Sequence, residues 1–243
     1  MTTPAAAAGP TPAPKSLLAR VIGVIVTPRE TFQSIVPAPK VFGILAVTTV
    51  LSAFFTALPM TTDAGKQAAI ENQVQQLQSF GMQVTDDMYD QFQKGAGRMP
   101  YTTGISVLFV GPIFGLIIAG IFFAIFNAAL GGEASFKQVF SVLMHAGVIS
   151  TLSAVVSGAV NYFSGRVGSV MNVGALMPML PEKSFGANLL GAIDVFLIWY
   201  IVVLAIGLGV LYKRRTQPIA ISLLSVYAVI ALLIAVLKSR GGA

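Results

Sequence analysis

The chain has 243 residues, of which 55% are hydrophobic and 10% are charged. An ordinary globular domain carries roughly 25% charged residues, so this composition excludes a protein with a fully hydrated surface. The chain has no cysteine, which excludes disulfides, thiolate nucleophiles and sulfur-ligated metals. Its net charge of +6 comes from basic residues that flank apolar stretches. That placement is typical of loops that face anionic lipid, so we expect membrane lipid and no nucleic acid as a partner.

The first forty residues divide into two parts. Residues 1–14 are rich in Ala and Pro and carry no charge, so we expect a disordered tail. Residues 15–40 form an amphipathic juxtamembrane segment, in which Lys15 and Arg20 lie away from an apolar helical face. That pattern predicts a helix lying in the membrane surface. The apolar face consists of Leu17, Leu18, Val21, Ile22 and Ile25.

Residues 41–237 form the predicted main domain, an all-α polytopic membrane protein with five transmembrane helices. An apolar helix of about 20 residues crosses a bilayer core. The predicted spans are residues 41–60, 104–130, 137–163, 188–212 and 219–237. Residues 61–103 are polar but keep helical apolar spacing, which predicts a helical hairpin outside the membrane.

Small residues at every fourth position predict where these helices approach closely. They are Gly111, Gly115 and Ala119 in the second span, Ser150, Ala154 and Gly158 in the third, and Ala205 and Gly209 in the fourth.

Basic residues set the predicted orientation. Lys213, Arg214 and Arg215 end the fourth span, and we count Trp199 with them as a topology anchor. Short basic loops mark the cytoplasmic side of a membrane. We therefore expect a cytoplasmic N-terminus and, with five spans, an extracytoplasmic hairpin and C-terminus.

Asp194, His145 and Asn127 are the intramembrane polar candidates, because such groups need partners in lipid. At 1.5 Å per residue, His145 lies about 12 Å from the cytoplasmic end of its span and Asp194 about 9 Å from the outer end of its own. In a core about 30 Å thick their heights differ by roughly 9 Å, so no direct pair is expected. We expect structural hydrogen bonds for His145. Asp194 is either capped near the interface, by Asn188 or loop backbone, or lines a partner-binding or conducting surface.

Three stretches resemble the Yip1-domain family, and bacterial members are similar to this chain across residues 16–237. They are RVIGVIVTPRETFQSI (20–35), GGEASFKQVFSV (131–142) and IDVFLIWYIVVLAIGL (193–208), in which Asp194, Trp199 and Gly207 stand on matching positions. The resemblance implies a five-helix bundle in the bacterial inner membrane. Eukaryotic members bind small GTPases through Asp-Leu-Tyr-Gly-Pro and Gly-Tyr motifs, which this chain lacks, so no small GTPase is expected.

The sequence predicts a non-enzymatic accessory or scaffold protein that binds another membrane protein. The resemblance implies a component of an ABC-type efflux complex as one such partner. The sequence offers no phosphate-binding loop and no metal-ligand motif, so we predict no catalytic residue, no metal and no cofactor. Two alternatives stay open: a small transporter or channel with a polar path near Asp194 and His145, and an intramembrane hydrolase that uses His145.

Overall fold

The computed structural model describes residues 16–176 and 184–240, and the predicted tail at residues 1–14 lies outside them. Within the described ranges the regular elements are helices, with one isolated antiparallel bridge between Asn172 and Asp194. The elements are α1 (Leu17–Val26), α2 (Pro28–Ile35), α3 (Phe42–Ala57), η1 (Leu58–Thr61), α4 (Asp63–Ser79), α5 (Asp86–Gly95), η2 (Ala96–Arg98), α6 (Met99–Phe123), the π-helix η3 (Ala124–Ala129), α7 (Phe136–Ala146), α8 (Val148–Ser164), η4 (Val173–Leu176), α9 (Phe185–Gly191), α10 (Val195–Leu211) and α11 (Thr216–Arg240).

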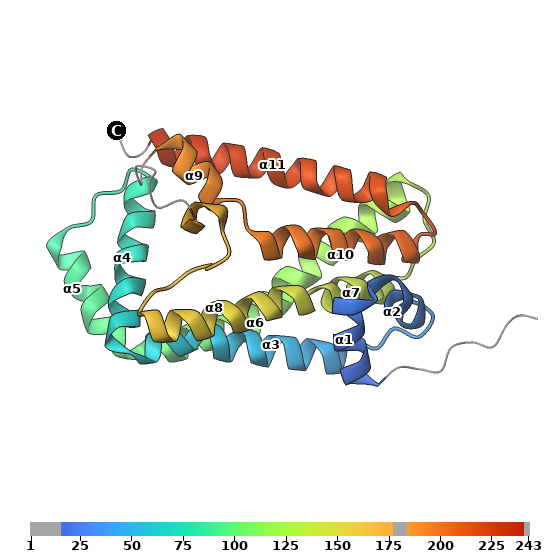
Figure 1. Cartoon of the computed structure of the whole chain (residues 1–243), viewed down its shortest axis with the longest axis horizontal. Coiled ribbons are helices and arrows are strands. Elements are labelled where there is room, and N and C mark those ends of the chain that lie inside the picture. The colour runs from blue at the N-terminus through green and yellow to red at the C-terminus, as the bar shows by residue number, and fades with distance from the viewer. Residues whose placement is uncertain (1–15, 177–183, 241–243) are drawn as a thin grey trace, which may run out of the picture.

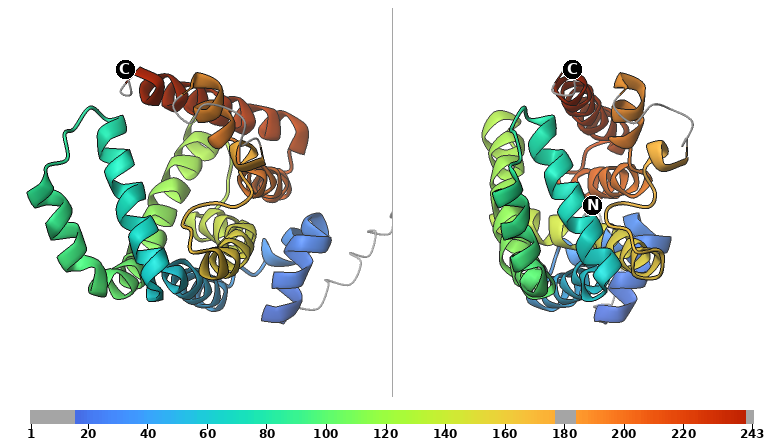
Figure 2. Two further views of the ribbon diagram at one scale, coloured as in Figure 1. Left: turned by 60° about the vertical axis from the view of Figure 1, so that its left-hand side comes forward. Right: turned by 90° about the vertical axis from the view of Figure 1, so that its left-hand side faces the viewer.

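The long helices run along the long axis of the molecule in two groups (Figure 1). In the first group α3 packs against α6 and α8, and α7 packs against α6. In the second group α11 packs against α9 and α10. Helix α10 joins the groups, because it also packs against α7, α8 and α2. Helices α1 and α2 lie at one end of the bundle, and α4 and α5 lie at the other (Figures 1 and 2).

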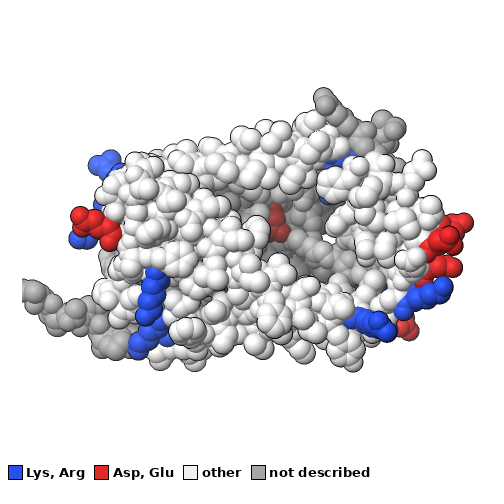
Figure 3. Space-filling view, turned by 180° about the vertical axis from the view of Figure 1, so that it is seen from behind, with Lys and Arg blue, Asp and Glu red and all other residues white. Residues whose placement is uncertain are grey.

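On the face that Figure 3 shows, charged side chains gather at these two ends, and the surface between them is uncharged except for acidic atoms in a central hollow. Large apolar side chains remain exposed along the middle of the bundle, among them Phe109 and Phe114 on α6 and Val229 and Leu233 on α11. Water would not tolerate so large an apolar surface on a monomer, whereas lipid tails cover it. The bundle is therefore an integral membrane protein whose long axis crosses the bilayer.

Four of the five predicted spans correspond to helical segments that are long and apolar enough to cross a membrane. They are Phe42–Thr61, Asp86–Ala129, Phe136–Ser164 and Thr216–Ser239. The predicted continuous span at residues 188–212 is wrong, because the chain there breaks between α9 and α10. Helix α10 has 17 residues and is about 25 Å long, which is short of a core of about 30 Å. The count of five crossings stays a prediction.

Close approach between helices depends on part of the predicted set of small residues. A Cβ at Gly158 would collide with the carbonyl oxygen of Phe55 on α3. A Cβ at Gly115 would lie 2.6 Å from Met144 Cε, and Ala119 and Ala205 are fully buried. Gly111 is different, because a Cβ there would meet no atom within 4 Å. The prediction of close packing at Gly111 is therefore wrong.

Gly209 and Gly207 belong to the packed face of α10. A Cβ at Gly209 would lie 3.0 Å from Thr216 Oγ1, at the start of α11. A Cβ at Gly207 would lie 2.6 Å from Val142 Cγ1 and 3.0 Å from Phe32 Cζ. Glycine at position 207 thus lets α2 and α7 both reach α10.

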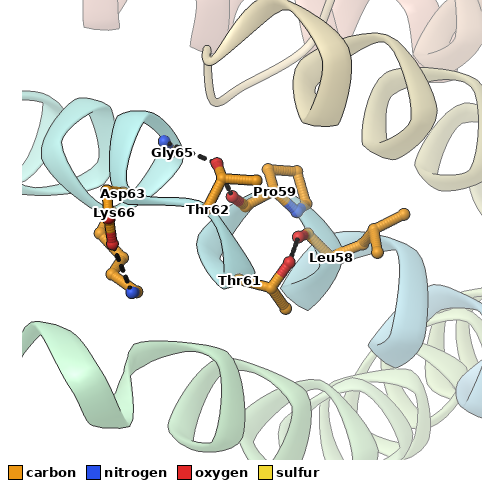
Figure 4. Close-up of polar contacts among 7 residues, drawn as sticks. All are labelled: Leu58, Pro59, Thr61, Thr62, Asp63, Gly65 and Lys66. Atoms are coloured by element: carbon orange, nitrogen blue, oxygen red, sulfur yellow. Dashed lines mark hydrogen bonds and ion pairs between the residues drawn. The ribbon is translucent and has the colours of Figure 1, made fainter.

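The predicted hairpin at residues 61–103 is helical, and a tight corner turns it across the end of the bundle (Figure 4). Thr62 caps α4, since its Oγ1 accepts from the backbone N–H of Gly65 (3.0 Å) and donates to the carbonyl of Pro59 (2.9 Å). A Cβ at Gly65 would collide with that carbonyl. Lys66 pairs with Asp63 at 2.9 Å, and its ammonium group lowers the pKa of the exposed Asp63 carboxyl.

Helix α1 is turned differently from the prediction. Arg20, expected on the polar face, points into the protein and is 9% exposed. Leu18, Ile22 and Val26 form an outward apolar stripe and are 68%, 51% and 70% exposed. The apolar pattern alone could not decide the direction, because lipid outside the bundle accepts apolar side chains as readily as the core does.

Replacing Gly158 with alanine should lower the free energy of unfolding by about 1–3 kcal/mol, because the added methyl group pushes α3 and α8 apart. Gly120→Ala is the matched control, since it adds the same group to α6 where no atom lies within 4 Å. Thermal unfolding of both variants in detergent is the measurement. A Gly158→Ala variant as stable as the Gly120→Ala control would contradict this packing.

Candidate functional site

The break between α9 and α10 is built around Asp194. Asp194 is the N-cap of α10, and its carboxylate accepts from the backbone N–H of Leu197 at 3.0 Å. The hydroxyl of Ser169 donates to the second carboxylate oxygen in a short hydrogen bond. Asp194 is half-buried. Because its carboxylate accepts both of these hydrogen bonds, it would not be an isolated charge in lipid. The predicted cap of Asp194 by Asn188 or by loop backbone is wrong, because Asp194 is itself the N-cap of α10 and its carboxylate is paired with the Ser169 hydroxyl and the Leu197 N–H. Its role in a partner-binding or conducting surface stays a prediction.

A loop after α8 lies beside the break and pairs with it as an extended strand would. The backbone N–H of Val173 donates to the carbonyl of Ile193 (2.9 Å), and the N–H of Val195 donates to the carbonyl of Met171 (3.2 Å). These bonds satisfy backbone groups that the interrupted helix leaves unpaired, which is required of irregular backbone at membrane depth.

Tyr227 on α11 completes the break, and the sequence reasoning missed it. Its hydroxyl donates to the carbonyl of Ala192 (2.6 Å) and accepts from the backbone N–H of Asp194 (3.0 Å). A tyrosine in the middle of an apolar helix was the available signal, because a buried phenol normally has a hydrogen-bond partner.

A cavity of about 290 Å³, lined by both polar and apolar side chains, adjoins this network. Its lining includes Ser153, Ser157, Asn161 and Ser169, and Ser169 connects it to the Asp194 carboxylate. Asn161 holds the loop by donating to the carbonyl of Gly168 at 2.7 Å. Ser150 and Ala154, predicted as packing residues, also line the cavity.

His145 belongs to a separate network near the end of α7. The ring is fully buried, and its Nδ1 lies 2.7 Å from the carbonyl oxygen of Ser141. An N–H on Nδ1 satisfies that carbonyl and leaves Nε2 to accept from Arg20 Nη1 at 3.2 Å. Arg20 also donates to the carbonyl of Lys40 at 3.2 Å. The predicted structural hydrogen bonding of His145 is confirmed, and it shares no hydrogen-bond partner with Asp194.

The remaining candidates lie at the turns and in the core. The side-chain amide of Asn127 donates to the carbonyl of Ala134 at 2.5 Å and closes the turn before α7. Trp199 packs against the hydrophobic core and stacks on Phe196 at 6.3 Å, so its role as a membrane anchor stays a prediction. Lys213, Arg214 and Arg215 are exposed in the turn between α10 and α11.

The titratable side chains of the described residues form no group with the geometry of a metal site or of a serine nucleophile with its base. Within residues 16–176 and 184–240, no group of three or more His, Asp or Glu side chains could hold a metal ion. The serines near Asp194 face a carboxylate but no histidine, and the serine near His145 faces no carboxylate. Nucleophilic catalysis by serine normally needs a base held in place by a third group. The geometry therefore offers a cavity with several polar side chains beside a broken helix.

Replacing Asp194 with alanine should lower the free energy of unfolding by about 1–2 kcal/mol, because α10 loses its N-cap and the Ser169 hydroxyl loses its acceptor. Asp194→Asn should retain most of the stability, since asparagine is an equally good N-cap. Fluorescence of Trp199, the single tryptophan of the chain, can follow thermal unfolding of both variants. Equal losses in the two variants would show that the charge, and not the cap, stabilises this site.

Comparison with known proteins agrees with this architecture. The chain is 28% identical over 235 residues to the membrane protein YknW of Bacillus subtilis strain 168, covering 92% of this chain and 93% of the relative. No solved structure matches. The model of the Yip1 domain matches residues 22–237, which include α2 to α10 and most of α11. The chain is therefore a member of the Yip1 domain family of membrane proteins.

Proposed function

We propose that this protein is a non-enzymatic accessory or scaffold subunit, and that the α4–α5 hairpin docks onto another membrane protein. The observation that carries the proposal is that α5 has no buried residue. It is continuous through η2 with α6, in one helical segment from Asp86 to Ala129. Here side-chain bonds from Gln67 on α4 to Tyr89 (2.9 Å) and Gln93 (2.8 Å) hold it in place. The chain thus maintains, at the end of the bundle, a helix without a fully buried residue, in which Met88, Tyr89 and Phe92 are half-buried.

The surface of the hairpin has the composition of a binding site. Phe80 and Met82 at its tip are 68% and 48% exposed. Asp86, Asp87 and Asp90 on α5 form an acidic patch beside them. Exposed aromatic and methionine side chains are enriched at protein interfaces. The complementary partner surface is an apolar pocket with a basic rim.

The proposal includes an orientation of the bundle in the membrane. The short turn at residues 213–215 is wholly basic, whereas the longer segments at the other end mix basic with acidic residues, and this difference supports a cytoplasmic assignment for the end that holds α1 and α2. In this orientation the N-terminus is cytoplasmic, and α9 and α10 together make the fifth crossing of the inner membrane. The hairpin and the C-terminus are then extracytoplasmic. A component of an ABC-type efflux complex is the partner class that the family resemblance suggests.

The triple variant Asp86→Lys, Asp87→Lys, Asp90→Lys should lose a co-purifying membrane protein, because the acidic patch would repel a basic rim. Tagged protein is isolated from gently solubilised native membranes, and the partner is identified by mass spectrometry as an integral membrane protein. Glu30→Lys, an exposed charge reversal at the opposite end of the bundle, is the control. Isolation of the wild-type chain as a lone monomer, or equal partner recovery with both variants, would contradict the proposal.

A transporter or channel is the second candidate function, and the break at Asp194 is the observation that favours it. Transporters place binding sites at discontinuous helices, where cavities meet exposed backbone groups. His145 is fully buried, and both of its ring nitrogens are already hydrogen-bonded, to Arg20 and to Ser141. It therefore has no free ring nitrogen with which to bind an ion that passes Asp194.

If this second function holds, protein reconstituted in liposomes should carry protons or sodium ions, and Asp194→Asn should abolish the flux while the fold persists. A dye that reports internal pH or sodium is the measurement, with empty liposomes as the control. Absence of flux in the wild type, or unchanged flux in the variant, would reject a transport role for Asp194.

A further inference from the structure

Four cationic side chains surround one polar hollow at the end of the bundle that holds α1 and α2. They are Arg29 on α2 and Lys213, Arg214 and Arg215 in the turn between α10 and α11. All four are exposed, no acidic side chain lines the hollow, and none of the four forms an ion pair within the described ranges. The N-terminus of α11 opens onto the same hollow and adds positive potential. The hollow is therefore an electrostatic site for an anion.

The backbone of the turn supports this reading. The N–H of Arg214 donates to the carbonyl of Gly209 (2.9 Å), and the N–H of Lys213 donates to the carbonyl of Val210 (3.4 Å). This pattern is a Schellman motif, in which the left-handed position is usually glycine. Here Lys213 occupies that position at φ +53°. A lysine therefore occupies a backbone conformation that glycine would adopt without steric cost.

An apolar groove of about 550 Å³ begins at the same arginines. It runs between the end of α6 with its π-helical extension and the first half of α11. Arg214 and Arg215 line it at one end, and its walls include Phe122, Ile125, Leu223 and Val226. Ile125 and Val226 are 45% and 58% exposed, so no described part of the chain covers the groove. Charge and apolar surface are therefore continuous in one site.

We propose that this site binds one anionic phospholipid, with its phosphate between Arg214 and Arg215 and one acyl chain in the groove between α6 and α11. The complementarity has two parts. The cations have no anionic partner among residues 16–176 and 184–240, and the groove beside them is complementary to an apolar chain attached to such an anion. A free phosphate or a nucleotide would pair with the cations but leave the groove empty. A zwitterionic lipid would fill the groove, but its own cationic group would be repelled by the four cationic side chains.

The test compares lipids that share acyl chains and differ in charge. Full-length protein in detergent is titrated with phosphatidylglycerol or phosphatidylcholine, and binding is measured by native mass spectrometry. We expect phosphatidylglycerol to bind more tightly. Each arginine near a lipid headgroup contributes a factor of about five, so Arg214→Gln with Arg215→Gln should weaken binding roughly thirty-fold. Lys94→Gln with Arg98→Gln removes two exposed cations at the opposite end and is the matched control.

Further variants separate headgroup, chain and folding. Ser222→Trp should block the groove and weaken binding without touching the cations. Arg29→Gln with Arg215→Gln preserves the hydrogen bond from Arg214 Nη2 to the carbonyl of Leu130 (2.9 Å) and replaces the first variant if that one unfolds. Equal affinity for both lipids, equal binding in the arginine and control variants, or glycerol phosphate binding as tightly as the lipid would each overturn the proposal. So would unchanged binding in Ser222→Trp.

Discussion

The fold depends on one constraint, which is that the backbone groups released at the break before Asp194 must find partners inside the membrane. The structure meets it with groups from several segments. Tyr227 comes from α11, Ser169 and the backbone of Met171 and Val173 come from the loop after α8, and Asp194 caps its own helix. Removing one of these groups leaves a buried polar atom unpaired, which costs about 1–3 kcal/mol. The break therefore fixes how α9, α10 and α11 sit against the first group of helices.

A second polar contact ties the other end of the bundle together. Arg20 is nine-tenths buried, and its hydrogen-bond acceptors are the ring of His145 and the carbonyl of Lys40 rather than a carboxylate. An arginine stays protonated in a protein, so the neutral histidine has to serve as the acceptor. This bond joins α1 to α7, although the two residues are 125 positions apart. Helix α1 is thus anchored to the bundle on one side and presents apolar side chains to lipid on the other.

The sequence was sufficient for the elements whose cause is local. Length and hydropathy predicted the membrane-spanning helices, the hairpin and the turns, because these follow from spacing along one segment. The direction of Arg20 and the role of Asp194 depend instead on groups that are far away in the chain. Ser169 and Tyr227 lie 25 and 33 residues from Asp194, and no local pattern couples them. The continuous span predicted at residues 188–212 was wrong for the same reason, since an apolar run does not reveal a break that distant partners stabilise.

The two ends of the bundle differ in a way that suits two kinds of partner. At one end the turn between α10 and α11 concentrates cations that have no acidic neighbour in their hollow and are continuous with an apolar groove. At the other end α5 carries acidic residues and has no fully buried residue. A lipid can satisfy the first surface, because it brings charge and chain together. The acidic residues of the second surface would repel a lipid headgroup of negative charge, which is why we propose a protein with a basic rim as its partner. Between these two ends, α10 packs closely against its neighbours through Ala205, Gly207 and Gly209, because these residues are small. This close packing connects the two ends of the bundle.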